Sequence, residues 1–221
     1  MNWNREIAGI IINLLMATTV FFLIVKRKQL GSHVEYFIGA IGLLTTIEIF
    51  NSILMTLNPT YNSSAVYVVG VNFFVFLLFL IYFKKVLYTK RLKNFSLMII
   101  GLFFLNYLLS ALLIDNFFGQ FSFFSYFVEI VLVMGSIYLV LSQTFNSDKV
   151  LSLSTYFPFS VCISLLITYL GILPLLIISN TAAKMMNLEI FFTILFIVNV
   201  VGYLILLIGI FRAKKEKEVT I

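Results

Sequence analysis

The chain has 221 residues, of which 62% are hydrophobic and only 11% are charged, and its mean hydropathy is +1.09. Soluble domains carry about 25% charged residues, so this composition excludes a soluble globular protein. The formal net charge is +6 at pH 7, but the basic residues occupy gaps between long apolar runs. That arrangement favours membrane topology over nucleic-acid binding. Cys162 is the only cysteine, so an internal disulfide is impossible.

Seven apolar stretches are long enough to cross a bilayer as helices, which takes about 18 or more residues. Helices are expected because the hydrocarbon core offers backbone groups no hydrogen-bond partners, and the alternation typical of β-barrel strands is missing. In chain order the stretches cover residues 7–25, 36–56, 65–83, 95–114, 121–143, 157–179 and 188–211. The sequence therefore predicts an all-α integral membrane protein with a bundle of seven transmembrane helices. Residues 1–221 are expected to form this single transmembrane domain, without a soluble domain.

The positive charges predict on which side of the membrane each end of the chain lies. Apart from Arg5 and Lys184, all Lys and Arg residues fall in alternate gaps, which are residues 26–35, 84–94, 144–156 and 212–221. Short loops rich in Lys and Arg stay in the cytoplasm, so we expect the N-terminus outside and the C-terminus in the cytoplasm. Anionic lipid headgroups are the expected partners of the basic face. The predicted location is a bacterial inner membrane, which the chain crosses several times.

The predicted spans contain three acids and no Lys, Arg or His. Glu189 stands at the mouth of the last span, whereas Glu48 and Glu129 each lie eight residues from the outer end of theirs, a depth of about 12 Å. Ionisable residues inside a membrane are costly, so both deep acids are candidate functional residues. Neither has a basic partner in a span. Each is therefore expected to be protonated and hydrogen-bonded, or to open to a water-filled outer cavity.

Asparagine side chains accompany these acids at a similar depth. Residues at i, i+3, i+4 and i+7 share a helix face, and the polar faces of the second to fifth spans are expected to point into the bundle. They predict an outward-facing polar cavity whose ligand-binding residues are Glu48, Asn51, Asn72, Asn106 and Glu129. The competing interpretation is structural, because Asn, Ser and Thr side chains also hydrogen-bond between packed membrane helices.

Two further patterns have structural interpretations. The sixth span carries a stripe of small and hydroxyl residues at i+4 spacing, Ser160, Ser164, Thr168 and Gly171. Such a stripe is typical of close packing between membrane helices. Tyrosines near span ends, including Tyr67 and Tyr82, are expected in the interfacial aromatic belt.

No pattern in the sequence indicates catalysis, a metal site or a cofactor. The spans hold no His and no Asp, so they lack the catalytic pairs of intramembrane proteases, and the lone His33 has no second metal ligand nearby. The seven-span layout resembles that of rhodopsins and other seven-helix receptors. The last span has no Lys that could hold retinal, and the layout alone does not define a function.

Three functional hypotheses follow from the predicted cavity. The first is a receptor- or sensor-like module that binds a cation, a proton or a small polar ligand at the acids. Its output would require a protein partner at the basic face, because the residues after 211 are too few to signal alone. The second is a proton- or cation-coupled transporter or channel. The third is an accessory membrane subunit without a ligand of its own.

Overall fold

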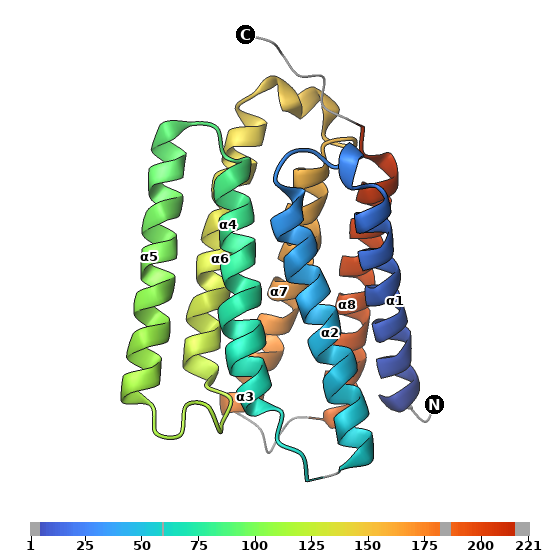
Figure 1. The fold of residues 1–221 in the computed structure, drawn as a ribbon, viewed down its shortest axis with the longest axis vertical. Helices are drawn as coiled ribbons and strands as arrows, with labels where there is room; N and C mark the ends of the chain where they lie inside the picture. Colours follow the sequence, from blue (N-terminus) through green and yellow to red (C-terminus); the bar gives the residue numbers. More distant parts are fainter. Residues whose placement is uncertain (1–4, 59, 182–186, 215–221) are drawn as a thin grey trace.

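The computed structural model describes residues 5–58, 60–181 and 187–214, and it confirms the all-α fold. Seven of its helices are long and apolar enough to cross a membrane, and they run side by side along the bundle (Figure 1). The described residues contain no strand. Lys184, Lys215 and Lys217, which belong to the charge pattern above, lie outside the described residues.

The helices match the predicted spans closely. Four helices form the first, second, fourth and fifth spans: α1 Arg5–Val25, α2 Val34–Leu57, α5 Lys90–Leu113 and α6 Phe123–Phe145. The last two spans are α7 Phe157–Thr181 and α8 Leu188–Arg212. The third span is continuous but has three parts: α3 Ser64–Val66, the π-helical segment η2 Tyr67–Val75, and α4 Phe76–Val86. Two short 3-10 helices lie in connections: η1 Arg27–Gln29 and η3 Asp148–Ser152.

The largest difference from the predicted boundaries is between the third and fourth spans. Residues 84–94 are predicted as a loop, but the connection is only the segment 87–89. Helices α4 and α5 continue through the basic residues because Lys and Arg are good helix formers and need not remain in the apolar layer. The hydropathy pattern thus predicts where the apolar layer ends, and the helices run beyond it.

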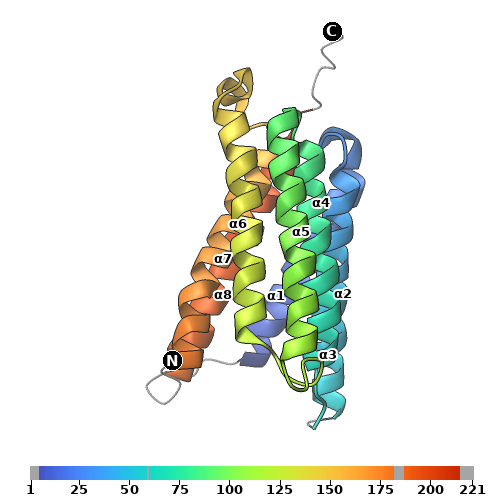
Figure 2. The same cartoon turned by 90° about the vertical axis from the view of Figure 1, so that its left-hand side faces the viewer.

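Six spans form a ring, and α5 packs outside this ring. Contacts join α1 to α2, α2 to α4, α4 to α6, α6 to α7, α7 to α8, and α8 back to α1. Helix α5 contacts α4 and α6, and Figure 2 shows it in front of the bundle between these two helices. The interior of the ring is therefore enclosed without any contribution from α5.

The two ends of the bundle differ in charge. The connections 26–33, 87–89 and 146–156 lie at the same end as residue 214, at the top of Figure 1. We call this the basic end, because Lys and Arg residues gather in these connections and in the helix ends beside them. Helix α1 begins at the opposite end, which we call the N-terminal end. That the basic end faces the cytoplasm remains a prediction.

Aromatic side chains pack together near the basic end of the ring. The Phe37 ring centroid lies 5.3 Å from that of Tyr82, 5.8 Å from Phe79 and 6.0 Å from Phe157, within the range of favourable aromatic pairs. All four side chains are at most 2% exposed. We call these four residues the aromatic floor. Tyr82 is part of it and does not belong to an interfacial belt.

Helices α7 and α8 pack through small residues. A side chain at Gly202 would collide with Thr168, and one at Gly209 would collide with Ser160. The hydroxyl of Ser164 donates a hydrogen bond to the carbonyl oxygen of Gly202 at 2.8 Å. Much of the predicted i+4 stripe therefore serves the contact with α8, which small residues permit by letting the backbones approach.

Candidate functional site

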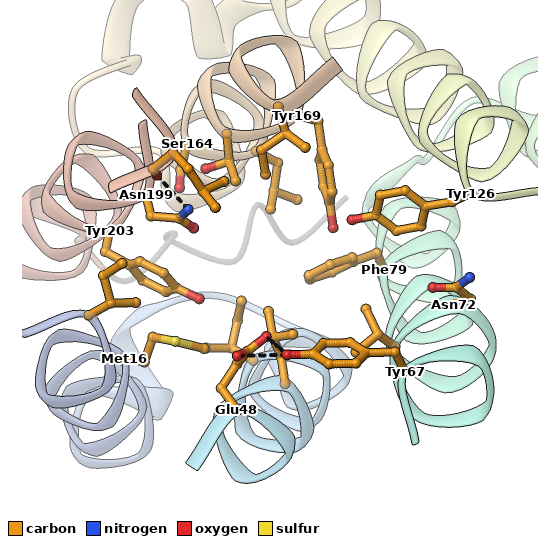
Figure 3. A pocket seen from close by; sticks show the side chains of 18 of the residues that line it. Met16, Glu48, Tyr67, Asn72, Phe79, Tyr126, Ser164, Tyr169, Asn199 and Tyr203 are labelled. Atoms are coloured by element: carbon orange, nitrogen blue, oxygen red, sulfur yellow. Dashed lines mark hydrogen bonds between the residues drawn. The ribbon is translucent and has the colours of Figure 1, made fainter. Parts of the chain in front are cut away.

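A cavity of about 400 Å³ lies inside the ring (Figure 3). Its lining extends from Phe121 and Leu176 near the N-terminal end, past the middle of the bundle, to Phe79 and Leu206. The polar lining residues are Glu48, Tyr67, Asn72, Tyr126, Ser164, Thr168, Tyr169, Asn199 and Tyr203. The remaining side chains of the lining are apolar. This size and this mixture of apolar walls with a few polar groups are typical of small-molecule sites.

Glu48 is the chemically distinctive group of the cavity. Of the described residues, it alone brings a formal charge to the lining. It projects from α2, and its carboxyl oxygens accept hydrogen bonds from the hydroxyl of Tyr67 at 3.0 and 3.1 Å. Figure 3 shows this pair at the edge of the cavity, with the carboxyl group directed inward. The Tyr67 bond fixes the carboxyl orientation and leaves it further lone pairs for a ligand.

Four tyrosines surround the same space, each from a different part of the ring. Tyr67, Tyr126, Tyr169 and Tyr203 come from η2, α6, α7 and α8. In Figure 3 their hydroxyl groups point into the cavity or toward its rim. A tyrosine hydroxyl can both donate and accept a hydrogen bond, so the cavity offers a ring of adaptable polar contacts around one carboxyl group.

The π-helical segment η2 supplies part of this site. It covers Tyr67–Val75 and contributes Tyr67, Val71 and Asn72 to the lining. π-Helices are rare and occur frequently at functional sites, because their wider turns place side chains where an α-helix would not. Nothing in the hydropathy pattern distinguishes this segment from an ordinary helix, so sequence reasoning missed it.

Of the five residues predicted to bind a ligand, two line the cavity. Glu48 does so directly, whereas Asn72 is 1% exposed and lies to one side of the cavity, away from its centre (Figure 3). No described residue forms a hydrogen bond with either amide atom of Asn72. Asn51 does not line the cavity; its side-chain oxygen accepts a hydrogen bond from the Tyr61 hydroxyl at 3.2 Å.

The other two predicted residues form a separate network between α5 and α6. The Asn106 amide donates to the Ser125 hydroxyl and to the Ser125 carbonyl oxygen, both at 3.3 Å. The Ser125 hydroxyl in turn donates to Glu129 at 3.2 Å. Glu129 is fully buried, and its second carboxyl oxygen has no hydrogen-bond partner among the described residues. Because α5 lies outside the ring, Asn106 cannot reach the cavity.

Tyr126 connects this network with the cavity. It precedes Glu129 by three residues on α6, which places both on one face of the helix. Tyr126 lines the cavity, whereas Glu129 does not. Of the two predicted acids, only Glu48 is in the cavity. The ligand-binding role of all five predicted residues remains a prediction.

The sequence signal for the tyrosines is weak. Tyr67 lies near the end of its span, a position that favours an interfacial role, and the structure places it beside Glu48 instead. Tyr169 and Tyr203 are each a single tyrosine within an apolar run, and Tyr126 stands next to Phe127 and close to Phe124. Only the arrangement of the ring brings their hydroxyl groups together.

The fold defines a polytopic membrane protein with seven membrane-spanning helices and an internal cavity. Within the residues that the structure describes, no three His, Cys, Asp or Glu side chains gather as metal ligands would. The chain matches no protein-family model, and no similar protein is found among curated proteins or solved structures.

Proposed function

We propose that the protein is a receptor- or sensor-like binding module, not an enzyme, whose cavity binds a small organic cation such as a primary ammonium. The observation that carries this proposal is one carboxyl group, Glu48, in a cavity of about 400 Å³ whose other lining residues are uncharged. Desolvating an ionised group without a partner costs several kcal/mol. A cationic ligand would supply the opposite charge that the lining does not.

The shape and chemistry of the cavity suit an ammonium attached to an apolar body. An ammonium group has three N–H donors and no acceptor. The Glu48 carboxyl oxygens and nearby tyrosine hydroxyl oxygens are matching acceptors, and charge-assisted hydrogen bonds of this kind are about twice as strong as neutral ones. The apolar wall, which includes Met16, Ile41 and Leu206, would bury the hydrocarbon part of the ligand.

The floor of the cavity supports binding over transport. A transport pathway needs polar groups that continue toward the basic end. On α7, the hydroxyl groups of the lining that lie nearest the basic end are those of Ser164 and Thr168. Beyond them the ring is filled by the buried side chains Phe37, Phe83 and Val161. Such close packing excludes water and leaves an ion without partners. The alternative of a cation-coupled transporter would require this floor to open.

Orientation completes the proposal. With the N-terminal end outside, as the charge distribution predicts, the cavity would sample the external solution of a bacterial-type inner membrane. A bound ligand would contact all six ring helices, because each of them contributes to the lining. A shift of these helices on binding would reach the basic end, where a protein partner would detect it.

The experiment compares a cationic probe with a neutral probe of nearly the same shape. We would purify the protein in an uncharged detergent and measure its melting temperature with increasing benzylamine or benzyl alcohol. At about 100 times its Kd, a ligand specific for the folded state raises the melting temperature of a chain of this size by about 5 °C or more. We expect the melting temperature to rise in a saturable way with benzylamine but not with benzyl alcohol. In Glu48→Gln the benzylamine effect should be lost.

Glu129→Gln is the matched control, because it removes an acid of the same type that does not line the cavity. It should keep the benzylamine effect even if its own melting temperature differs. An equal effect of benzylamine on wild type and Glu48→Gln, or no effect at all, contradicts the proposal. A Glu48-dependent flux of protons or benzylamine into reconstituted vesicles would favour the transport alternative instead.

A further inference from the structure

A second, smaller cavity opens at the basic end and is separate from the site around Glu48. Its volume is about 250 Å³. It is lined by residues 29–33 before α2, residues 85–88 at the end of α4 and just after it, residues 155–158 around the start of α7, and single residues of α5, η3 and the segment after α8. Parts of the chain that are far apart in sequence therefore meet around one hollow.

Lysine side chains line this hollow from four different elements. Lys85 lies in the last turn of α4, Lys93 lies in the first turn of α5, Lys149 lies in η3, and Lys214 follows α8. No Asp or Glu is found among the described residues of the lining. Like charges brought together repel one another, and an anion that enters the hollow would offset this repulsion.

The positive-inside rule explains why lysines occur at this end, but it does not explain their convergence. Lys84 and Lys90 lie on the same two helices as Lys85 and Lys93, and they do not line the hollow. Topology requires only that basic residues be on one side of the membrane. Convergence of four of them on a concave site is a separate feature, which points to a bound anion.

Hydrogen bonds hold the walls of the hollow in place. The Gln143 side-chain oxygen accepts hydrogen bonds from the backbone N–H groups of Tyr88 and Thr89 at 2.8 and 3.2 Å, which fixes the connection between α4 and α5. The backbone N–H of Lys214 donates to the carbonyl oxygen of Thr155 at 3.4 Å. A preformed site binds more tightly because less ordering accompanies binding.

Lys149 shows how the positive charges are presented. Its ammonium nitrogen lies 4.4 Å from the ring centroid of Tyr156 and 3.4 Å from the Tyr156 hydroxyl oxygen, and 5.8 Å from the ring of Tyr88. Aromatic faces attract a cation without neutralising its charge. These two rings hold Lys149 in the wall of the hollow.

We propose that this hollow is a binding site for a phosphate group, held by Lys85, Lys93 and Lys214. A phosphate group carries up to two negative charges and several acceptor oxygens, and lysine binds it as a point charge. The hydroxyl of Ser32 and the amide of Gln29 also line the hollow and offer neutral donors. The phosphate would come either from the headgroup of an anionic lipid or from a soluble phosphate compound. This site is independent of the cation proposed at Glu48.

The test measures the melting temperature of the detergent-purified full chain at constant ionic strength with two pairs of probes. Inorganic phosphate is compared with chloride, and dihexanoyl phosphatidic acid with dihexanoyl phosphatidylcholine. We expect a saturable rise with phosphate or with phosphatidic acid, but not with chloride or phosphatidylcholine. A rise with inorganic phosphate identifies a free anion as sufficient, whereas a rise with phosphatidic acid alone identifies the lipid headgroup.

The double variant K85Q/K93Q should weaken binding of the effective probe on the order of 10- to 100-fold, since each charged contact contributes roughly tenfold. The matched double variant K84Q/K90Q changes the net charge equally on the same helices and should bind as wild type does. If K85Q/K93Q does not fold, K214Q, at the exposed last described residue, carries the same test. No saturable rise with either probe, or equal weakening in both double variants, overturns the proposal.

Discussion

Replacing Gly202 by alanine tests how closely α7 and α8 must approach. Gly202 is buried, and a Cβ atom there would overlap the Thr168 hydroxyl oxygen. To relieve this overlap, either the Thr168 side chain must turn or the two helices must separate. Separation would also lengthen the 2.8 Å hydrogen bond from Ser164 to the Gly202 carbonyl. The substitution therefore acts on packing and on one buried hydrogen bond together.

The expected free-energy change combines three contributions. Alanine in a helix interior is favoured over glycine by about 1 kcal/mol. Overpacking costs about 1–3 kcal/mol, and weakening the hydrogen bond costs about 1 kcal/mol. The net expectation for Gly202→Ala is a loss of about 2 kcal/mol in unfolding free energy. Gly101→Ala is the control, because no atom lies within 4 Å of its added Cβ, and it should gain up to about 1 kcal/mol.

Reversible unfolding in mixed micelles titrated with sodium dodecyl sulfate measures these differences. The variant Thr168→Ala removes the hydroxyl that the new Cβ meets, so Gly202→Ala combined with Thr168→Ala should recover most of the loss. A double-mutant cycle isolates this coupling. The reasoning is refuted if Gly202→Ala is as stable as Gly101→Ala, or if removing the Thr168 hydroxyl restores nothing.

Substitutions at three other residues test the polar groups. Gln143→Leu removes the acceptor for two backbone N–H groups and should cost about 2 kcal/mol, whereas Gln143→Glu keeps that acceptor and should lose less; equal losses would contradict this role. Ser125→Ala removes the hydrogen bond to the fully buried Glu129 and should cost about 1–3 kcal/mol in the same titration. Tyr67→Phe removes the hydrogen bond to Glu48, but water in the cavity can replace it, so the loss should stay below about 1 kcal/mol. A larger loss for Tyr67→Phe than for Ser125→Ala would show that water does not reach Glu48.

The sequence predicted the helices well because span length and hydropathy are direct consequences of bilayer thickness. It also singled out Glu48, since an acid inside an apolar run is costly wherever it lies. The lateral positions of the helices were not predictable in the same way. Lipid tails are as apolar as a protein core, so no hydropathy signal distinguishes α5, which packs outside the ring, from the helices that enclose the cavity.

The predicted cavity and the observed one differ because the sequence does not show which helices are neighbours in the ring. Asn106 and Glu129 have the expected depth in their helices, yet α5 and α6 bring them to Ser125 and not to the cavity. The tyrosine hydroxyls went unrecognised because tyrosine suits a membrane interface and a binding site equally well. Depth along a helix can be counted from a sequence, whereas the direction of a side chain depends on neighbours that the sequence does not order.

The closed aromatic floor has an electrical consequence for any ion that binds at Glu48. Glu48 lies nine residues before Leu57, the last residue of α2, which is about 14 Å along the helix in a hydrocarbon layer about 30 Å thick. A full crossing of one charge is worth about 2.3 kcal/mol per 100 mV. A monovalent cation that stops at Glu48 would experience less than half of this, about 1 kcal/mol per 100 mV. The Kd of such a ligand would then shift by about fivefold per 100 mV, so a receptor of this shape would report membrane potential and ligand concentration together.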